Sequence, residues 1–239
     1  VQGRWSLTSS LLQGAPPIGP RLRARAELML ERHGIVTRET ALAEGIPGGF
    51  SSLYPELSNL EMLGTARRGY FVEGLGGAQF AIAGAVERLR SLPDTESEYV
   101  LLGATDPAQP YGAALAWPRR DRRPPEGPNG DGGDEAEPKG AKRGGRRPSR
   151  TAGAYVLLCD GVPQLYIERG GRGLLRLAEL DRGDLAAAVA ELAAATAAGT
   201  LPRLAIERID GEPAIGSGLE EILIGAGFSR QPRRLVSSG

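Results

Sequence analysis

The sequence is poor in the residues that usually build disulfides, metal sites and nucleophilic triads. Its 239 residues include one cysteine, Cys159, and one histidine, His33. A disulfide needs two cysteines, and a Cys/His zinc site or a serine, histidine and acid triad is hard to build from this chain. We therefore interpret Cys159 as a small apolar side chain of a strand, and His33 as a capping residue at the end of a helix.

Long apolar runs and nucleotide-binding motifs are also missing. No segment approaches the roughly 20 apolar residues of a membrane-spanning helix, and the first residues lack the layout of a signal peptide. We therefore expect a cytoplasmic protein without membrane contact. No Gly-x-x-x-x-Gly-Lys-Ser/Thr stretch is present, and Asp134-Glu135-Ala136-Glu137 lacks the apolar strand of a Walker B box. Because these motifs are missing, we expect no nucleotide motor and no cofactor in this chain. Because the chain opens on Val1, we also expect it to be a piece of a longer protein.

A net charge is missing as well, because 29 basic and 29 acidic side chains cancel. Bulk charge therefore gives no argument for nucleic acid binding. Between Pro118 and Ala154 the only residues of the hydrophobic set are alanines. Such a segment cannot offset its ordering entropy, so we predict a disordered loop over about residues 118–153. Its basic ends, residues 119–123 and 142–150, either contact a DNA backbone or form a solvated tether.

The first third of the chain has the helix order of a helix-turn-helix. Apolar residues at helical spacing predict a helix over Arg21–His33. Thr37 then offers an N-cap for a short helix, and Ser51 offers another for a longer helix that runs to Leu63. Helix, short helix, turn and longer helix succeed one another as in DNA-binding proteins of this class.

The segment after these helices has the pattern of a wing. Two strand candidates, Ala66–Val72 and Gln79–Ile82, flank a glycine-rich stretch that is typical of a wing. At the front, Arg4–Leu7 resembles a strand that enters the fold. We therefore predict a winged-helix domain over residues 1–93, with this lead-in strand.

The rest of the chain, residues 94–239, has mostly the pattern of strands. Asp160-Gly161 and Asp210-Gly211 are strong hairpin signals, and Asp184 is a candidate cap for one alanine-rich helix. We predict the fold class α+β, with a winged helix followed by a β-barrel-like α+β module that carries the loop as an insertion. The predicted strands of this module cover Tyr99–Leu102, Ala113–Trp117, Ala154–Cys159, Gln164–Glu168 and Leu204–Ile209.

The predicted recognition helix is nearly devoid of basic residues, which is unexpected for a reader of the major groove. Ser51, Ser52 and Tyr54 are still candidates for DNA contacts through their hydroxyl groups. The alternative is that this helix only packs against the core.

A better candidate cluster precedes the wing. Arg67 and Arg68 offer cations for phosphate, and Tyr70 offers a ring for stacking on an unpaired base. The alternative is a solvated strand edge. Arg172, in a glycine-rich turn, is a further DNA-binding candidate. The surface potential around Arg67, Arg68 and Arg172 would show whether they converge on one basic groove.

Three carboxylates stand at the ends of strands, where the acid of a base-excision enzyme could lie. They are Asp160, Glu168 and Asp210, and nothing in their spacing singles one out. The chain thus leaves an enzymatic alternative open without identifying a catalytic residue.

Four blocks of the sequence, in order, resemble the C-terminal region of Lhr, the large helicase-related proteins. They are Gly34–Glu39, Arg67–Phe80, Ala104–Gly112 and Tyr166–Arg172. The resemblance implies a superfamily-two, ATP-dependent 3′-to-5′ DNA helicase, whose motor core, with its ATP and Mg, lies upstream. It also implies an extension of tandem winged helices and a β-barrel module, associated with oligomer assembly and similar to winged-helix DNA glycosylases.

Three functions remain open on this basis. The first is a non-motor DNA-binding and assembly module for DNA repair, with DNA, the upstream helicase core and a second copy of the chain as partners. The second is a base-flipping glycosylase that uses a strand-end carboxylate such as Glu168. The third is a pure oligomerisation platform.

Overall fold

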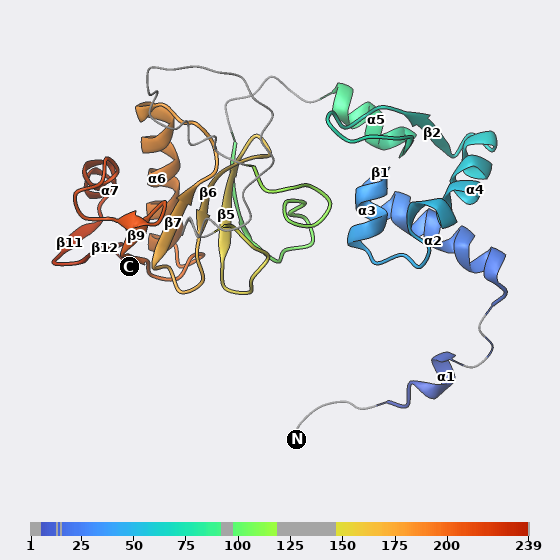
Figure 1. Cartoon of the computed structure of the whole chain (residues 1–239), viewed down its shortest axis with the longest axis horizontal. Coiled ribbons are helices and arrows are strands. Elements are labelled where there is room, and N and C mark those ends of the chain that lie inside the picture. Colours follow the sequence, from blue (N-terminus) through green and yellow to red (C-terminus); the bar gives the residue numbers. More distant parts are fainter. Residues whose placement is uncertain (1–5, 13, 15, 92–97, 119–146, 239) are drawn as a thin grey trace, which may run out of the picture. The chain divides into compact units, whose positions relative to one another are not determined.

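The computed structural model describes residues 6–12, 14, 16–91, 98–118 and 147–238, which form two compact units (Figure 1). The first unit covers Val1–Asp94 and the second covers Thr95–Gly239. Each unit has buried apolar clusters of its own.

The first unit has the element order and sheet topology of a winged helix. Its three strands pair antiparallel in the order β1-β3-β2. The elements are α1 (Ser9–Leu12), α2 (Ile18–His33), β1 (Ile35–Val36), α3 (Arg38–Ala43), α4 (Gly49–Met62), β2 (Ala66–Gly69), β3 (Gln79–Ile82) and α5 (Ala83–Arg90).

Apolar side chains at helical spacing build the core of this unit. Leu53, Leu57 and Leu60 lie along one face of α4 and are fully buried, together with Leu30 of α2 and Phe80 of β3. Fully burying a side chain of this size contributes about 1.5–3 kcal/mol to stability. This stripe therefore fixes α4 against α2 and the sheet.

Three local predictions for this unit are wrong. Ser51 does not cap α4, because the helix begins at Gly49 and Gly48 occupies the cap with a left-handed φ of 78°. The strand predicted over Ala66–Val72 ends at Gly69. The lead-in strand is absent from its described part, since Ser6 and Leu7 lie in no strand and residues 4–5 fall outside the described residues.

The second unit contains a six-stranded sheet in the order β10-β9-β7-β6-β5-β4, in which β7 and β9 are parallel and the other pairs are antiparallel. A smaller sheet has the order β11-β12-β8. The described pairings leave the large sheet open, so they do not confirm a barrel. The elements are β4 (Tyr99–Gly103), β5 (Tyr155–Cys159), β6 (Val162–Ile167), β7 (Gly173–Arg176), α6 (Arg182–Ala197), β8 (Ala205–Ile206), β9 (Arg208–Ile209), β10 (Glu212–Pro213), α7 (Glu220–Gly225), β11 (Ser229–Gln231) and β12 (Arg234–Val236).

One face of the large sheet packs against α6, which Figure 1 shows alongside β5, β6 and β7. The cap of α6 is Asp181, whose carboxylate accepts from the backbone N–H of Asp184 at 2.8 Å, so the prediction of Asp184 as the cap is wrong. Asp160 and Asp210 have positive φ values of 50° and 52° in the tight turns after β5 and β9. These turns confirm both Asp-Gly hairpin predictions.

Aromatic side chains cover the opposite face of the sheet. Trp117 stacks on Tyr111 with ring centroids 6.2 Å apart and meets Tyr166 edge-on at 5.6 Å. Burial raises the pKa of Tyr111. The strand predicted over Ala113–Trp117 is wrong, because the chain turns there to bring Trp117 over the sheet, with a single bridge between Tyr111 and Leu115.

Arg150 holds the aromatic segment in place. Its Nη1 donates to the carbonyl of Gln109 at 2.5 Å, and its Nη2 donates to those of Thr105 and Asp106 at 3.2 and 3.1 Å. Residues 119–146 of the predicted disordered loop lie outside the described residues. Its last part, residues 147–153, has a defined course in which Arg150 donates to backbone carbonyls, so the predicted loop is too long at this end.

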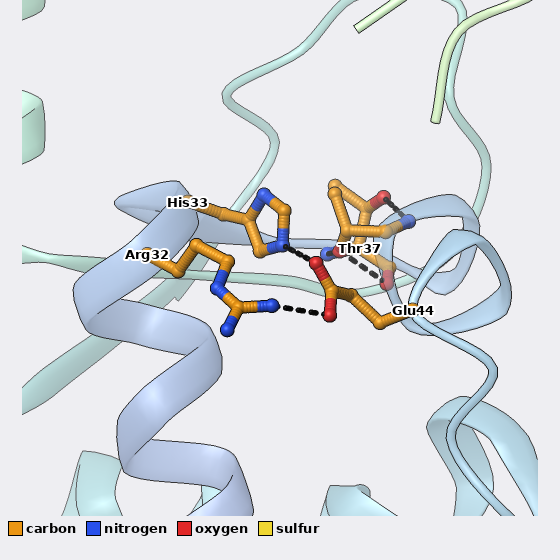
Figure 2. Close-up of polar contacts among 5 residues, drawn as sticks. Arg32, His33, Thr37 and Glu44 are labelled. Atoms are coloured by element: carbon orange, nitrogen blue, oxygen red, sulfur yellow. Dashed lines mark hydrogen bonds and ion pairs between the residues drawn. The ribbon is translucent and has the colours of Figure 1, made fainter. Parts of the chain in front are cut away.

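A charged contact joins the ends of α2 and α3 in the first unit (Figure 2). Arg32 donates to the carboxylate of Glu44 at 2.5 Å, and Nε2 of His33 lies 3.2 Å from the other oxygen. The hydrogen bond from Arg32 lowers the pKa of Glu44 most, against a smaller opposing effect of burial, and the Arg32 charge and His33 lower it further. His33 thus contacts Glu44, while Gly34 takes the predicted capping role through its N–H to Leu30.

Replacing Arg150 is expected to loosen the aromatic segment. We predict that Arg150→Ala lowers the free energy of unfolding by about 1.5–3 kcal/mol, because charged hydrogen bonds to several carbonyls are lost together. Urea unfolding followed by the near-ultraviolet circular dichroism of the chain, to which Trp117 contributes, measures this change. Arg147→Ala removes an exposed arginine nearby and is the control, with an expected change within about 0.5 kcal/mol. Equal stability of the two variants would contradict the role of Arg150.

Replacing Glu44 is expected to change stability in a pH-dependent way. The folded pKa of this carboxyl lies below its ordinary value of 4.5, so its contribution is fully present above that value and is lost as the pH falls through the folded pKa. We predict that Glu44→Gln is less stable than the parent by up to about 1 kcal/mol near neutral pH. Thermal unfolding at several pH values should show this difference shrinking below the ordinary pKa. A difference that grows on acidification, or an equal effect from exposed Glu31→Gln, would refute the assignment.

Candidate nucleic-acid interface

The recognition helix α4 offers few free polar groups. Ser51 is exposed in its first turn, but the hydroxyl of Ser52 donates to the carbonyls of Pro47 and Gly49 at 2.9 and 2.8 Å. Tyr54 is half-buried. The helix carries no lysine or arginine, so it supplies no cation for a phosphate group.

Arg68 is engaged inside the unit. Its Nε donates to Glu61 at 2.9 Å, its Nη2 contacts the same carboxylate, and its Nη1 donates to the hydroxyl of Tyr54 at 3.0 Å. The guanidinium carbon also lies 5.5 Å from the ring centroid of Tyr54 and 5.3 Å from that of Phe80, within the range of cation–π contacts. Arg68 therefore ties β2 to α4, and its positive charge is balanced by Glu61.

Arg67 and Tyr70 remain at the surface. Successive strand residues point to opposite faces, which explains why neighbouring Arg67 and Arg68 have different surroundings. Arg67 is exposed, and no residue that the structure describes accepts a hydrogen bond from its guanidinium group. The side chain of Tyr70 is 85% exposed at the start of the wing. The predicted cluster is thus divided into one engaged arginine and a free arginine and tyrosine.

The start of the wing is held by the buried side-chain amide of Gln79, which was not among the residues predicted from the sequence. The Oε1 of fully buried Gln79 accepts from the N–H groups of Phe71 and Val72, both at 2.8 Å, and its Nε2 donates to the carbonyls of Val72 and Leu75. This side chain replaces ladder hydrogen bonds, which is why β2 ends before Tyr70. A polar residue opening an apolar strand is the only signal that could have identified it.

Arg172 lies in the second unit, in the turn between β6 and β7. Its side chain is 68% exposed, and its Nε lies 3.9 Å from Glu207. Arg67 and Arg68 belong to the first unit, so Arg172 and these two arginines are described separately.

The three candidate carboxylates are occupied by local contacts. Asp160 accepts from the N–H of Glu98 at 2.9 Å, and Asp210 accepts from the N–H and Nε of Arg176 at 2.8 and 2.7 Å. The side chain of Glu168 is 12% exposed and lies where a Cβ at Gly173 would stand. These contacts explain all three as turn residues, and none of them identifies a catalytic acid.

The second unit also contains a cleft of about 580 Å³ between the start of α6, the β9–β10 hairpin and α7. Arg176 and Asp210 pair on its wall, above apolar residues such as Leu185 and Ile209. Across the described residues, no group of His, Cys, Asp or Glu side chains could hold a metal ion. Nor does any helix in the described part of the chain have the length and apolar character to cross a membrane.

Comparison with known proteins identifies relatives of the whole chain. Residues 17–101 match the family model of the winged-helix domain of the large helicase-related protein. A protein of Mycolicibacterium smegmatis named Lhr helicase/probable uracil glycosylase is 42% identical over 98% of the chain. An Escherichia coli protein named Lhr helicase/uracil glycosylase is 36% identical, also over 98%.

The chain spans 15% of the length of the mycobacterial relative and 14% of that of the E. coli relative. The match to the winged-helix model coincides with the part of the chain that folds as β1-β3-β2 against α2, α3 and α4. The resemblance predicted from the four sequence blocks is thereby confirmed, and the chain belongs to the Lhr family of helicase-related proteins.

Proposed function

We propose that the chain is the non-motor DNA-binding and assembly module of an ATP-dependent 3′-to-5′ DNA helicase that acts in DNA repair. Its relatives are named Lhr helicase and are several times longer, which leaves room for a motor core elsewhere in the protein. ATP and Mg would bind to that core, which is the first partner of this module. A cytoplasmic location fits this role.

The observation that carries the proposal is that Arg67 and Tyr70 are both exposed at the entry to the wing. A free guanidinium group attracts phosphate, and an exposed aromatic ring stacks on any unpaired base. Together they suit a helicase substrate, in which duplex meets single strand. The wing, rather than the recognition helix, is therefore the proposed contact.

The charge of α4 also favours the wing, rather than this helix, as the DNA contact. Glu56 and Glu61 are its only charged residues, and Glu61 is paired with Arg68. A helix with two carboxylates and no cation is repelled by the phosphates that border the major groove. We therefore expect binding that depends on salt and on DNA structure, with little preference for base sequence.

The assembly part of the proposal uses the open edges of the large sheet. The strands β4 and β10 each lack a described neighbour on one side. A strand from an adjoining domain or a second copy could pair there and complete the barrel-like arrangement predicted from the sequence. Homo-oligomer formation is thus a proposal for this surface.

The first test replaces the two exposed residues at the wing. Arg67→Ala combined with Tyr70→Ala is expected to weaken binding to a fluorescein-labelled, single-strand-tailed duplex about tenfold or more, since a stacked base alone is worth about 1–3 kcal/mol. Fluorescence anisotropy of the whole chain measures the affinity. Arg23→Ala is the control, because it removes the same charge from an arginine already bonded to Glu27 at 2.7 Å.

Two results would contradict the proposed function. One is no DNA binding by the parent chain at any salt concentration, and the other is equal weakening by the wing variant and the Arg23 control. Light scattering on the same samples tests assembly, and a strict monomer at high concentration contradicts that part.

A base-excision activity is a second candidate, favoured by the names of both relatives, which include uracil glycosylase. Among the strand-end carboxylates, the most enclosed described side chain is that of Glu168, at 12% exposure. If it is the catalytic acid, uracil-containing DNA treated with the chain and then alkali is cleaved, and Glu168→Gln abolishes cleavage. If the parent chain does not cleave the DNA, the chain has no such activity. If the variant cleaves it fully, Glu168 is not the catalytic acid.

A further inference from the structure

The arginines of the second unit fall into two groups. In the first group the guanidinium groups donate hydrogen bonds inside the unit, as Arg150 does to backbone carbonyls and Arg176 does to Asp210. In the second group they donate few or none. Four members of this group lie on the segments around the turn formed by Gly170 and Gly171, while exposed Arg147 and Arg233 belong to other segments. An arginine without an internal acceptor keeps its full set of donors for a ligand.

The turn itself is fixed by packing. Gly170 and Gly171 have φ values of +81° and +67°, and the N–H of Gly171 donates to the carbonyl of Glu168 at 2.9 Å. The carbonyl of Gly171 accepts from Ala205 at 3.0 Å, and a Cβ at Gly171 would lie 2.9 Å from Leu204. Side chains on either side of the turn are therefore presented from a rigid backbone.

Four arginines surround this turn. Arg169 and Arg172 flank the two glycines, and the Cγ of Arg169 lies beside Gly153. Arg208 is opposite Gly173 in the β7–β9 register. The fourth, Arg203, immediately precedes the Leu204 that packs on Gly171. Three separate chain segments thus place arginines around one turn.

The donors of these arginines are almost unused. Within the part of the chain that the structure describes, Nε of Arg203 donates to the carbonyl of Ser237 at 3.2 Å, and the other three arginines donate no side-chain hydrogen bond.

Two carboxylates lie near these arginines at ion-pair distance. Arg172 is 3.9 Å from Glu207 and Arg208 is 3.9 Å from Glu168, which is too long for a hydrogen bond. The four arginines outnumber these two carboxylates, so the segments around the turn carry an excess of positive charge.

We propose that these four arginines form a binding site for the sugar-phosphate backbone of DNA. The planar guanidinium group donates two parallel hydrogen bonds to a phosphate, and several such groups on a rigid turn match successive phosphates of a strand. The inference rests on the proposed DNA-binding function and adds a second contact surface in the other unit. It predicts recognition of the backbone without reading of bases.

The test replaces the two exposed members that flank the glycines, in Arg169→Ala combined with Arg172→Ala. In the anisotropy assay with the tailed duplex, the dependence of affinity on salt between about 50 and 200 mM should lose about 2 units of slope, roughly one for each lost phosphate contact. Both side chains are exposed and donate no described hydrogen bond, so the fold should persist, and circular dichroism checks this. Arg169→Lys combined with Arg172→Lys should restore most of the slope, because it keeps the charges.

The matched control is Arg182→Ala combined with Arg234→Ala. It removes two charges from the same unit, but from arginines already paired with Glu221 at 3.1 Å and Gln231 at 2.7 Å, and it should leave the slope unchanged. A parental slope in the Arg169 and Arg172 variant, while the wing variant still weakens binding, overturns this site and leaves the proposed function standing. An equal loss of slope in the control also overturns it. No binding by the parent chain overturns the proposed function and this site together.

Discussion

The pairing of Arg68 with Glu61 is the contact that decides how β2 is joined to α4 and where positive charge lies on the winged helix. It places a guanidinium group between a carboxylate and the rings of Tyr54 and Phe80, and so binds the strand before the wing to the recognition helix. The same pairing removes the nearest positive charge from the face of that helix. Among the described contacts of this strand, the unpaired guanidinium group is that of Arg67, on the opposite face. A phosphate is therefore best bound at Arg67.

In the second unit, too, internal contacts occupy some arginines and leave others exposed. Arg150 is used to fix the aromatic cover of the sheet, and Arg176 to fix the turn at Asp210. Because an arginine whose donors are satisfied internally has little left to offer a ligand, the remaining cations decide where an anion can bind. Four of them lie around the Gly170 turn, which is rigid and glycine-rich. In the function proposed here, both units contact the DNA backbone while the motor core supplies the movement.

Local chemistry made much of the fold predictable from the sequence. Thr37 forms a capping box with Thr40 because a hydroxyl at that position meets the free N–H groups of a helix start. Asp160 and Asp210 adopt positive φ because Asp-Gly is the pair that a tight hairpin turn favours. The wing was predictable from its glycines, and the family from four blocks in order.

The errors have two causes, a competing local signal and a tertiary contact. Ser51 is a good cap in isolation, but the positive φ of nearby Gly48 starts the helix earlier. Residues 113–117 have strand composition, yet the ring of Trp117 is needed over Tyr166. The candidate site was predicted in outline, but nothing local distinguishes Arg67 from Arg68, since only the fold brings Glu61 to one of them.

The most direct test of the account is a titration of the isotope-labelled chain with a single-strand-tailed duplex, monitored by nuclear magnetic resonance of the backbone amides and the arginine Nε–Hε groups. The residues expected to respond are Arg67, Tyr70, Arg169, Arg172 and Arg208, and Arg203 is expected to respond through its Nη groups because its Nε already donates to Ser237. The account predicts the largest shifts at these residues and almost none at Arg68, Arg150, Arg176 or along α4. Shifts concentrated along α4 and at Arg68 would contradict it.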